Sequence, residues 1–172
     1  MAKRRLHEKN LLVELRNSFL NLWPNCLYHK IKDDPIYSES KTRFSPKRPF
    51  DSFVAYRNRT VKKTLAIEAK SHHSSESWSI DKVEDHQVEG LKQAQDNGWI
   101  SFVILNVRFG RGNSRYNRCY LIDIDSLIAL RKQRKKSLKL QELEEQFPNI
   151  TWIKIEKLNK YFWDVIKLWN MI

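Results

Sequence analysis

The sequence predicts an α/β fold in which a central mixed β-sheet is flanked by helices. Residues 3–22 carry apolar side chains at spacings of four, four and three, which is the period of an amphipathic helix. Residues 100–107 form a continuous apolar, β-branched run that is typical of a buried central strand. The segments follow one another in the order helix, hairpin, helix, strands, helix. That order favours a single α/β domain over residues 1–172.

The first half of the chain is predicted to form one short strand and one hairpin. A strand is expected at residues 27–31, where apolar and polar side chains alternate. Residues 33–49 are expected to form a loop, because they contain three prolines, several serines and four basic residues. Strands at 50–56 and 64–70 then form the hairpin, and the polar connection at 57–63 carries four cations.

The second half of the chain is predicted to alternate helices with strands. Acidic residues open the helices and Gly98 ends the first of them, as helix capping favours. The expected elements are a loop at 71–79, a helix from Asp81 or Asp85 to Asn97, strands at 100–107 and 118–124 around a basic loop at 109–117, a helix from Asp125 into the basic run 131–136, a short helix at 140–147, a strand at 151–155 and an aromatic helix at 158–169.

The chain is strongly basic, with 32 Lys and Arg against 20 Asp and Glu, a net charge of +12 and a pI near 9.8. Such a charge favours a polyanionic partner. Nucleic acid is the first candidate, an anionic membrane surface is the second, and an inert basic surface is the alternative. Residues 108–139 hold ten basic and two acidic residues, so this segment alone contributes +8. We expect it to contact phosphates.

The composition also excludes several classes of protein. No apolar run approaches the length of about 18 residues that a membrane-spanning helix needs. The basic residues at 3–5 are followed by polar side chains rather than by the apolar core of a signal peptide. Cys26 and Cys119 stand alone, so neither a disulfide framework nor a zinc finger is expected. These observations predict a cytoplasmic protein without a membrane partner.

Three residues near the predicted hairpin carry the candidate chemistry. Glu68 and Lys70 lie two positions apart on one strand, so their side chains leave the same face. The hairpin can bring Asp51 beside Glu68. Residues 65–69 are apolar on both faces, which indicates a central strand, and a buried carboxylate and lysine there require partners or a catalytic role. A cross-strand salt bridge on an exposed hairpin is the alternative.

The chemistry expected of this set is metal-assisted cleavage of a phosphodiester. Two carboxylates that converge repel each other unless a cation lies between them, and Mg²⁺ prefers oxygen ligands. A bound Mg²⁺ polarises a phosphodiester and lowers the pKa of a metal-bound water. Lys70 would orient that water or offset the charge that develops at phosphorus. This is the chemistry of the Asp … Glu-X-Lys signature of the PD-(D/E)XK nucleases.

A second segment makes the pattern more specific. Residues 67–70, Ile-Glu-Ala-Lys, are followed after a polar loop by residues 85–89, Asp-His-Gln-Val-Glu. Together they resemble the RecU family of Holliday junction resolvases, which are dimeric, Mg²⁺-dependent nucleases of the PD-(D/E)XK superfamily. The resemblance implies a restriction-endonuclease-like core and an enzyme that nicks DNA. It extends over most of the chain and is specific at residues 64–91.

The resemblance implies roles for five residues. Asp51 and Glu68 would bind Mg²⁺, for which Mn²⁺ would substitute, and Gln87 would complete the metal site. Lys70 would stabilise the transition state. Glu14 on the first helix would orient the metal or its water, and a solvated helix glutamate is the alternative.

The sequence departs from the family at two points. Pro49 stands where the family usually has a threonine that binds the metal. RecU proteins carry a long stalk that enters the junction, and here the basic loop at 33–50 takes its place. Recognition of junction shape is therefore expected to differ.

Contacts with DNA phosphates are expected from basic residues of the two hairpins and of the run after residue 131. They are Arg57, Arg59, Lys62, Lys63, Arg111, Arg115, Arg118, Lys132, Arg134, Lys135 and Lys136. Two symmetric nicks in one junction imply a homodimer. The aromatic C-terminal segment 156–172 is a candidate for its interface.

The predicted function is a Mg²⁺-dependent, structure-selective endonuclease that resolves four-way DNA junctions by paired nicks. One alternative is a sequence-specific homing or restriction-like endonuclease on the same core, which the shortened stalk leaves open. A non-catalytic basic DNA-binding protein is the third candidate. The intact set of Asp51, Glu68 and Lys70 argues against it.

Overall fold

The computed structural model describes most of the chain. The described residues are 2–22, 26–31, 36–37, 43–44, 47–57, 62–111, 115–139, 141–142, 152–158 and 162–165. Side chains are described in these ranges except at 2–6, 8, 22, 36–37, 43–44 and 152–153. Within these ranges, no helix combines the length and the hydropathy needed to cross a lipid bilayer.

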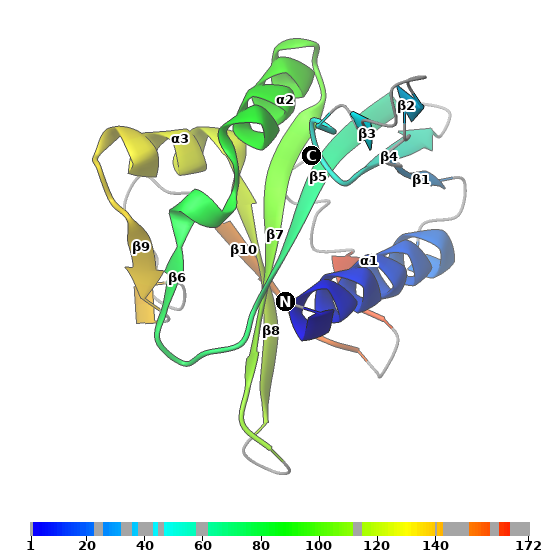
Figure 1. The fold of residues 1–172 in the computed structure, drawn as a ribbon. Coiled ribbons are helices and arrows are strands. Elements are labelled where there is room, and N and C mark those ends of the chain that lie inside the picture. The colour runs from blue at the N-terminus through cyan, green and yellow to red at the C-terminus, as the bar shows by residue number, and fades with distance from the viewer. Residues whose placement is uncertain are drawn as a thin grey trace.

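A mixed β-sheet forms the centre of the molecule (Figure 1). The order of its strands is β1–β4–β5–β7–β8–β10; β5 and β7 run parallel, and the other neighbours run antiparallel. The predicted mixed sheet is therefore confirmed. Its strands are β1 (Cys26–Lys30), β4 (Ser52–Arg57), β5 (Lys62–His72), β7 (Ile100–Phe109), β8 (Tyr116–Asp123) and β10 (Trp152–Ile155).

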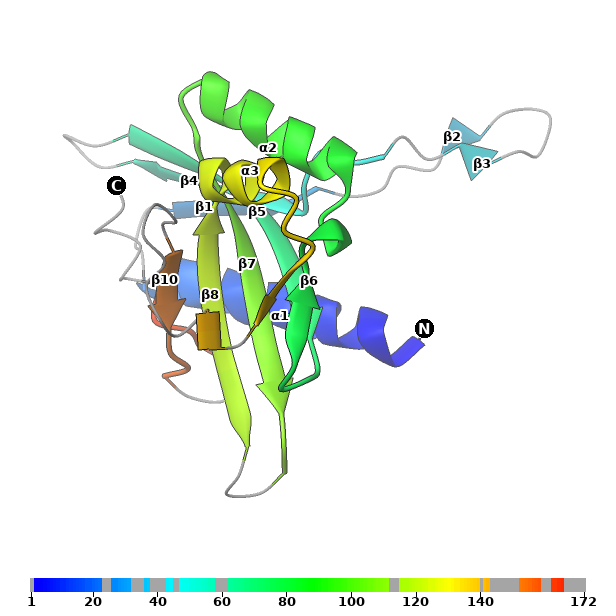
Figure 2. The same cartoon turned by 90° about the vertical axis from the view of Figure 1, so that its left-hand side faces the viewer.

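Helices cover both faces of the sheet, as the sequence predicted. The long helix α1 (Ala2–Leu22) lies on one face, and α2 (Asp85–Asp96) and α3 (Ile124–Lys132) lie on the other (Figures 1 and 2). A short 3₁₀ helix, η1 (Ile80–Lys82), precedes α2. The molecule thus has three layers, and each helix layer buries an apolar face of the sheet.

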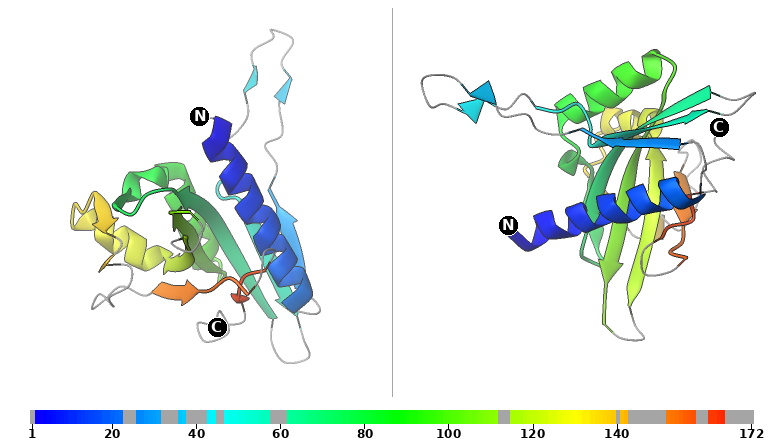
Figure 3. Two further views of the ribbon diagram at one scale, coloured as in Figure 1. Left: turned by 90° about the horizontal axis from the view of Figure 1, so that it is seen from below. Right: turned by 90° about the vertical axis from the view of Figure 1, so that its right-hand side faces the viewer.

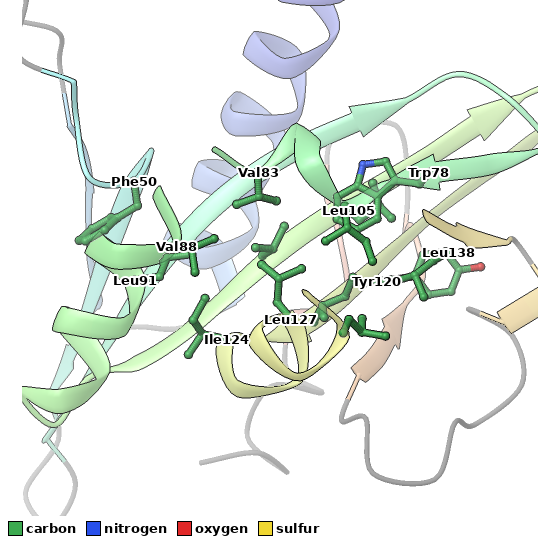
Figure 4. Packing of buried hydrophobic residues seen from close by; sticks show 14 of the residues in the cluster. Phe50, Trp78, Val83, Val88, Leu91, Leu105, Tyr120, Ile124, Leu127 and Leu138 are labelled. Atoms are coloured by element: carbon green, nitrogen blue, oxygen red, sulfur yellow. The ribbon is translucent and has the colours of Figure 1, made fainter. Parts of the chain in front are cut away.

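Two hydrophobic cores lie on opposite faces of the sheet. The first packs α1 through Leu15 and Phe19 against β5. The second packs α2 and α3 against the other face and contains Trp78, Leu127 and Leu138 (Figure 4). Strand β5 contributes to both cores, because successive side chains of a strand point to opposite faces.

The alternation along β5 decides which face receives its polar residues. Leu65, Ile67 and Ala69 belong to the core under α1, whereas Ala66 belongs to the core under α2 and α3. Glu68 therefore shares the α2 face with Ala66, and Lys70 follows it on the same side. The face that carries the candidate chemistry is the one covered by α2.

The capping residues differ from the prediction at the amino termini of two helices. Glu84, rather than Asp81 or Asp85, is the N-cap of α2, and it forms a capping box with Gln87. Asp123, rather than Asp125, caps α3, and its Oδ1 accepts a hydrogen bond from the backbone N–H of a residue three positions on at 3.0 Å. Neighbouring acidic residues compete for each cap, and the sequence alone does not rank them.

Two small strand pairs were not predicted. Strands β2 (Ile36–Tyr37) and β3 (Arg43–Phe44) pair within the segment expected to be a loop, and they stand clear of the body (Figures 2 and 3). Strand β6 (Ser77–Ser79) pairs with β9 (Ser137–Lys139), so the predicted loop at 71–79 is wrong at both ends. Strands of two or three residues are too short to leave a periodic pattern.

The C-terminal prediction is wrong in its described part. Residues 162–165 form no α-helix; instead Trp163 forms an isolated bridge with Lys157. The Trp163 side chain is fully buried, and its backbone N–H donates to Ser18 Oγ of α1 at 2.7 Å. Burial against α1 thus decides the path of this segment, and Trp163 is not available for a dimer interface. The helix expected at 140–147 lies almost wholly outside the described residues.

Helix α2 closely approaches the chain that leads into β4. A Cβ atom at Gly90 would lie 2.3 Å from the Cβ of Pro49 and 2.7 Å from its carbonyl oxygen. Two residues after Pro49 the chain reaches Asp51. Gly90 therefore sets how near α2 lies to the segment that carries Asp51.

We predict that Gly90→Ala lowers the free energy of unfolding by about 1–3 kcal/mol, because the new methyl group overlaps backbone atoms. It should also shift the backbone amide signals of Phe50 and Asp51. Urea denaturation and NMR spectra measure the two effects. The matched control is Gly98→Ala, since Gly98 has a φ of +82° and open space around it. The control should lose stability through backbone strain and leave both signals in place. An unshifted Asp51 signal in Gly90→Ala would contradict the prediction.

Candidate active site

Four polar residues from three separate segments of the chain meet near β5 and the start of α2. Lys70 Nζ lies 2.8 Å from Glu68 Oε1 and donates to Gln87 Oε1 at 2.9 Å. Gln87 Nε2 donates to the same Glu68 oxygen at 2.7 Å. Asp51 Oδ2 accepts a hydrogen bond from the backbone N–H of Ala69, between the other two signature residues, at 2.9 Å. The predicted convergence of Asp51, Glu68, Lys70 and Gln87 is present.

The register of the β4–β5 hairpin brings Asp51 to this point. Ser52 pairs with Ile67, and the backbone N–H of Asp51 donates to the Ile67 carbonyl at 3.1 Å. Asp51 therefore lies at the level of Glu68 on the neighbouring strand. On its other side, the carbonyl of Asp51 accepts from the backbone N–H of Ile31 at 2.9 Å. Backbone contacts on both sides hold the Asp51 carboxylate in place.

The first turn of α2 places Gln87. Its Oε1 accepts from the backbone N–H of Glu84 at 2.9 Å in the capping box and also from Lys70. The amide nitrogen consequently points to Glu68. In this orientation the Gln87 oxygen is directed to Lys70 and the helix cap rather than to the carboxylates. Gln87 thus connects Glu68, Lys70 and α2, while its predicted role as a metal ligand stays a prediction.

Burial makes this a strongly electrostatic site. The exposed fraction is 1% for Glu68, 5% for Asp51 and 7% for Gln87. Burial raises the pKa of Glu68 to about 7, and the charge of Asp51 adds to the rise, while Lys70 and Arg48 oppose it. Glu68 Oε2 is buried and has no hydrogen-bond partner among the described residues. Arg48 and Lys70 balance the two carboxylate charges, while Glu68 Oε2 remains an acceptor that its described neighbours do not satisfy.

Sequence reasoning missed Arg48. Its Nη2 lies 3.1 Å from Asp51 Oδ1, and its Nη1 donates to the carbonyl of Ile31 at 3.4 Å. The guanidinium supplies positive charge beside Asp51. The available signal was the position of Arg48 three residues before Asp51, but Arg48 did not stand out among the other basic residues of that loop.

The donor set fits a hard divalent cation. Asp51 lies opposite Glu68 on the neighbouring strand, and its charge acts on the Glu68 carboxyl. Glu68 Oε2 is buried and is an acceptor without a partner in the described part of the chain. Carboxylate oxygens are the ligands that Mg²⁺ prefers, and Mg²⁺ usually keeps several waters. No group of three or more His, Cys, Asp and Glu suited to a metal occurs in the described parts of the chain. Two carboxylates suit Mg²⁺ or Mn²⁺, which prefer oxygen ligands.

Glu14 is not part of the cluster, and its predicted role is wrong. Its Oε1 lies 2.8 Å from Lys157 Nζ, and its Oε2 accepts from Trp163 Nε1 at 2.9 Å. Both partners lie with α1 on the face of the sheet opposite to Glu68. Glu14 therefore fastens the C-terminal segment to α1. The helical period places Glu14 on α1 but does not say which face of the sheet α1 will cover.

The predicted phosphate contacts occupy three places: the end of the β4–β5 hairpin, the β7–β8 hairpin and the tail of α3. Arg118 pairs with Glu156 at 2.9 Å and Lys135 pairs with Glu142 at 2.7 Å, so both are engaged within the protein. Lys63 is partly buried, and Arg59 lies outside the described residues. The exposed members are Arg57, Lys62, Arg111, Arg115, Lys132, Arg134 and Lys136.

The chain shares similarity with known proteins. The model of the family RecU, described as recombination protein U, matches residues 40–166. Among solved structures, Hjc of Archaeoglobus fulgidus, described as a Holliday junction resolvase from an archaeal hyperthermophile, aligns with a TM-score of 0.40 and 19% identity. That alignment covers 80% of this chain and 88% of the Hjc chain. No curated protein matches the sequence.

We predict that Glu14→Ala lowers the free energy of unfolding by about 1–3 kcal/mol, because Trp163 Nε1 and Lys157 lose their partner. Urea denaturation measures this loss. The environment of Glu68 should not change, so the Mg²⁺ affinity of the folded variant should equal that of the wild type. A selective loss of Mg²⁺ affinity in Glu14→Ala would contradict the prediction and show that Glu14 contributes to the metal site.

The raised pKa of Glu68 predicts a pH-dependent stability in the metal-free protein. The folded state binds a proton more tightly than the unfolded state, so the contribution of Glu68 is lost as the pH rises from about 4.5 to about 7. In EDTA, Glu68→Gln should therefore become more stable than the wild type above pH 7, by at most about 3 kcal/mol, since one pKa unit corresponds to about 1.4 kcal/mol. Urea denaturation between pH 4 and 8 measures the difference. Glu76→Gln, at an exposed position, is the control, and parallel profiles for Glu68→Gln and the wild type would contradict the prediction.

Proposed function

The chain belongs to the RecU family, and from this membership we propose that it is a metal-dependent DNA endonuclease that resolves four-way junctions. The observation that supports this activity is the buried meeting of Asp51, Glu68, Lys70 and Gln87. The net charge of +12 supports a polyanionic substrate.

Asp51 and Glu68 would hold the divalent cation, Mg²⁺ with Mn²⁺ as a substitute. When bound, the metal polarises the scissile phosphodiester and lowers the pKa of a coordinated water. Glu68 binds it in the ionised form, so its pKa of about 7 in the metal-free protein predicts tighter metal binding as the pH rises through neutrality. Arg48 would leave Asp51 when the metal binds, because both neutralise the same carboxylate.

Lys70 is the residue we assign to the transition state. Its Nζ is fixed by Glu68 Oε1 and Gln87 Oε1, and its side chain is 12% exposed. A held ammonium group can orient the attacking water and offset negative charge that develops on the phosphate oxygens. Gln87 acts as a positioning residue, because it touches both Lys70 and Glu68.

The exposed cations support binding along the phosphate backbone. Arg134 adopts a φ of 57° at the end of α3, a position where glycine is common and a long side chain is strained. The presence of arginine there favours a role outside folding. Arg131, by contrast, pairs with Asp85 at 2.7 Å and holds α3 against the start of α2.

Junction specificity and paired nicking are further parts of the proposal. A symmetric dimer would present two active sites to the two strands that must be cut. The β2–β3 pair stands clear of the body, where the resemblance to RecU implies a stalk (Figure 3). We propose that this short ribbon contacts the branched substrate.

The test is incubation of the full chain with labelled four-way junctions and with linear duplexes of the same sequence, in Mg²⁺ and in EDTA. We expect symmetric nicks in junctions that require Mg²⁺. We expect Lys70→Ala to lower the nicking rate at least 100-fold, because loss of one preorganised donor costs about that much, and to leave junction binding unchanged. Lys30→Ala, at an exposed position of β1, is the matched control.

The same experiment separates the alternatives. Sequence-dependent cleavage of the duplex would favour a homing or restriction-like enzyme. Binding without metal-dependent cleavage by the wild type would favour a non-catalytic DNA-binding protein. If Lys70→Ala nicked at the wild-type rate, the proposed mechanism would be wrong.

A further inference from the structure

A second cluster of basic side chains lines a pocket on the α1 side of the sheet. The pocket has a volume of about 360 Å³ and lies where α1, the end of β5 and the β7–β8 hairpin meet. Its polar lining consists of His7, His73, Arg108, Arg111, Arg115 and Tyr116. Nothing in the proposed cleavage chemistry uses this pocket.

Arg108 ties the three elements together. Its Nη2 donates to the backbone carbonyl of His7 at 3.1 Å and to Ser71 Oγ at 3.2 Å. Ser71 Oγ in turn lies 3.2 Å from His73 Nε2, and the rings of His7 and His73 are 4.2 Å apart. The pocket is thus a connected arrangement of side chains rather than a chance group of surface residues.

The pocket holds an excess of positive charge. Three arginines supply this charge, two histidines lie beside them, and no carboxylate lines the pocket among the described side chains. Glu14, whose charge favours the ionised form of Arg108, is already engaged by Lys157 and Trp163. Partial burial, then the neighbouring His7, Arg108 and His72, lower the pKa of His73 to about 4. An anion in the pocket would relieve this repulsion.

One of the residues that line the pocket also carries an unsatisfied donor. The Nε–H of Arg108 is buried and has no hydrogen-bond partner among the described residues. Buried donors are normally paired, so the Arg108 guanidinium keeps capacity for a further acceptor. Guanidinium groups match the oxygens of phosphate in geometry and charge.

We propose that this pocket is a phosphate-binding site that takes a phosphodiester of the DNA backbone at a distance from the cleavage site. Arg108 and Arg111 or Arg115 would bind the phosphate oxygens, and the two imidazoles would add N–H donors. The inference rests on the proposed DNA substrate for the source of the phosphate. The evidence for an anion site in the pocket comes from its lining residues and their contacts, whatever the source of the phosphate.

The pocket and the cleavage site lie on opposite faces of the sheet, so the phosphate in the pocket is not the one that is cut. Asn106 and Arg108 follow Ile104 at intervals of two along β7, and Ile104 belongs to the core under α1. Glu68 and Lys70 point to the opposite face, where α2 lies. A phosphate in the pocket therefore lies on the other side of the sheet from the one at the active site.

The first arm of the test uses inorganic phosphate and the full chain in EDTA. NMR signals of the five histidine rings are followed during titration. We expect phosphate to shift the rings of His7 and His73, to raise the pH midpoint of His73, and to leave His29 and His86 unchanged. Arg111→Ala/Arg115→Ala should abolish the shifts; both residues are exposed, so the fold should be retained. The control Arg16→Ala/Lys30→Ala removes the same charge from exposed positions outside the pocket.

The second arm uses a labelled four-way junction, also in EDTA, so that cleavage plays no part. We expect the junction to shift the same two rings. We expect Arg111→Ala/Arg115→Ala to reduce the slope of log affinity against log salt by about 1, since each lost phosphate contact removes about 0.9 from the slope. The control variant should keep the wild-type slope.

The outcomes separate this inference from the proposed function. Equal shifts of all five histidine rings, or shifts that remain in Arg111→Ala/Arg115→Ala, would contradict phosphate binding in this pocket, whether or not the protein cleaves junctions. Shifts with phosphate but none with the junction would overturn the DNA backbone as the source. If both probes shift the rings of His7 and His73 in a protein that cleaves no DNA, the phosphate site would be supported and only the proposed cleavage would be wrong.

Discussion

The buried contact among Glu68, Lys70 and Gln87 is the interaction on which the site depends. Glu68 is 1% exposed, and both partners reach one of its oxygens. Gln87 of α2 is hydrogen-bonded to both Glu68 and Lys70 of β5, at 2.7 Å and 2.9 Å, so this contact holds β5 and α2 in a fixed relation. It also leaves the second carboxylate oxygen without a partner in the described structure. The site is therefore held by its own contacts, and Glu68 still has an oxygen that a cation can bind.

Strand β5 connects the fold with the chemistry, because it lies between β4 and β7 and has helices on both faces. One set of alternate side chains fills the core under α1, and the other set carries Glu68 and Lys70 toward α2. The same central position removes water from the carboxylate and raises its pKa. A signature on an edge strand would keep its charges solvated and its pKa values ordinary. The electrostatics of the site therefore follow from strand order.

The sequence predicted long, strongly periodic elements well and weakly patterned ones poorly. The segments that became α1, β5 and β7 carry clear helical or strand patterns, and each was predicted within two residues of its observed ends. The strands β6 and β9 left no pattern, because each is three residues long. The aromatic C-terminal segment misled the prediction, since the burial of Trp163 against α1 outweighs its local helical spacing.

The sequence by itself determined the residue types, the Glu-X-Lys spacing that puts Glu68 and Lys70 on one face, and the excess of positive charge. Only the tertiary structure decided which partners those groups meet. The hairpin register set Asp51 beside Glu68, and the capping box turned Gln87 toward Lys70. The packing of α1 on the other face removed Glu14 from the site. The physical reason is that local periodicity fixes the direction of a side chain relative to its own element, whereas the choice of face and neighbour depends on how separate elements bury their apolar surfaces together.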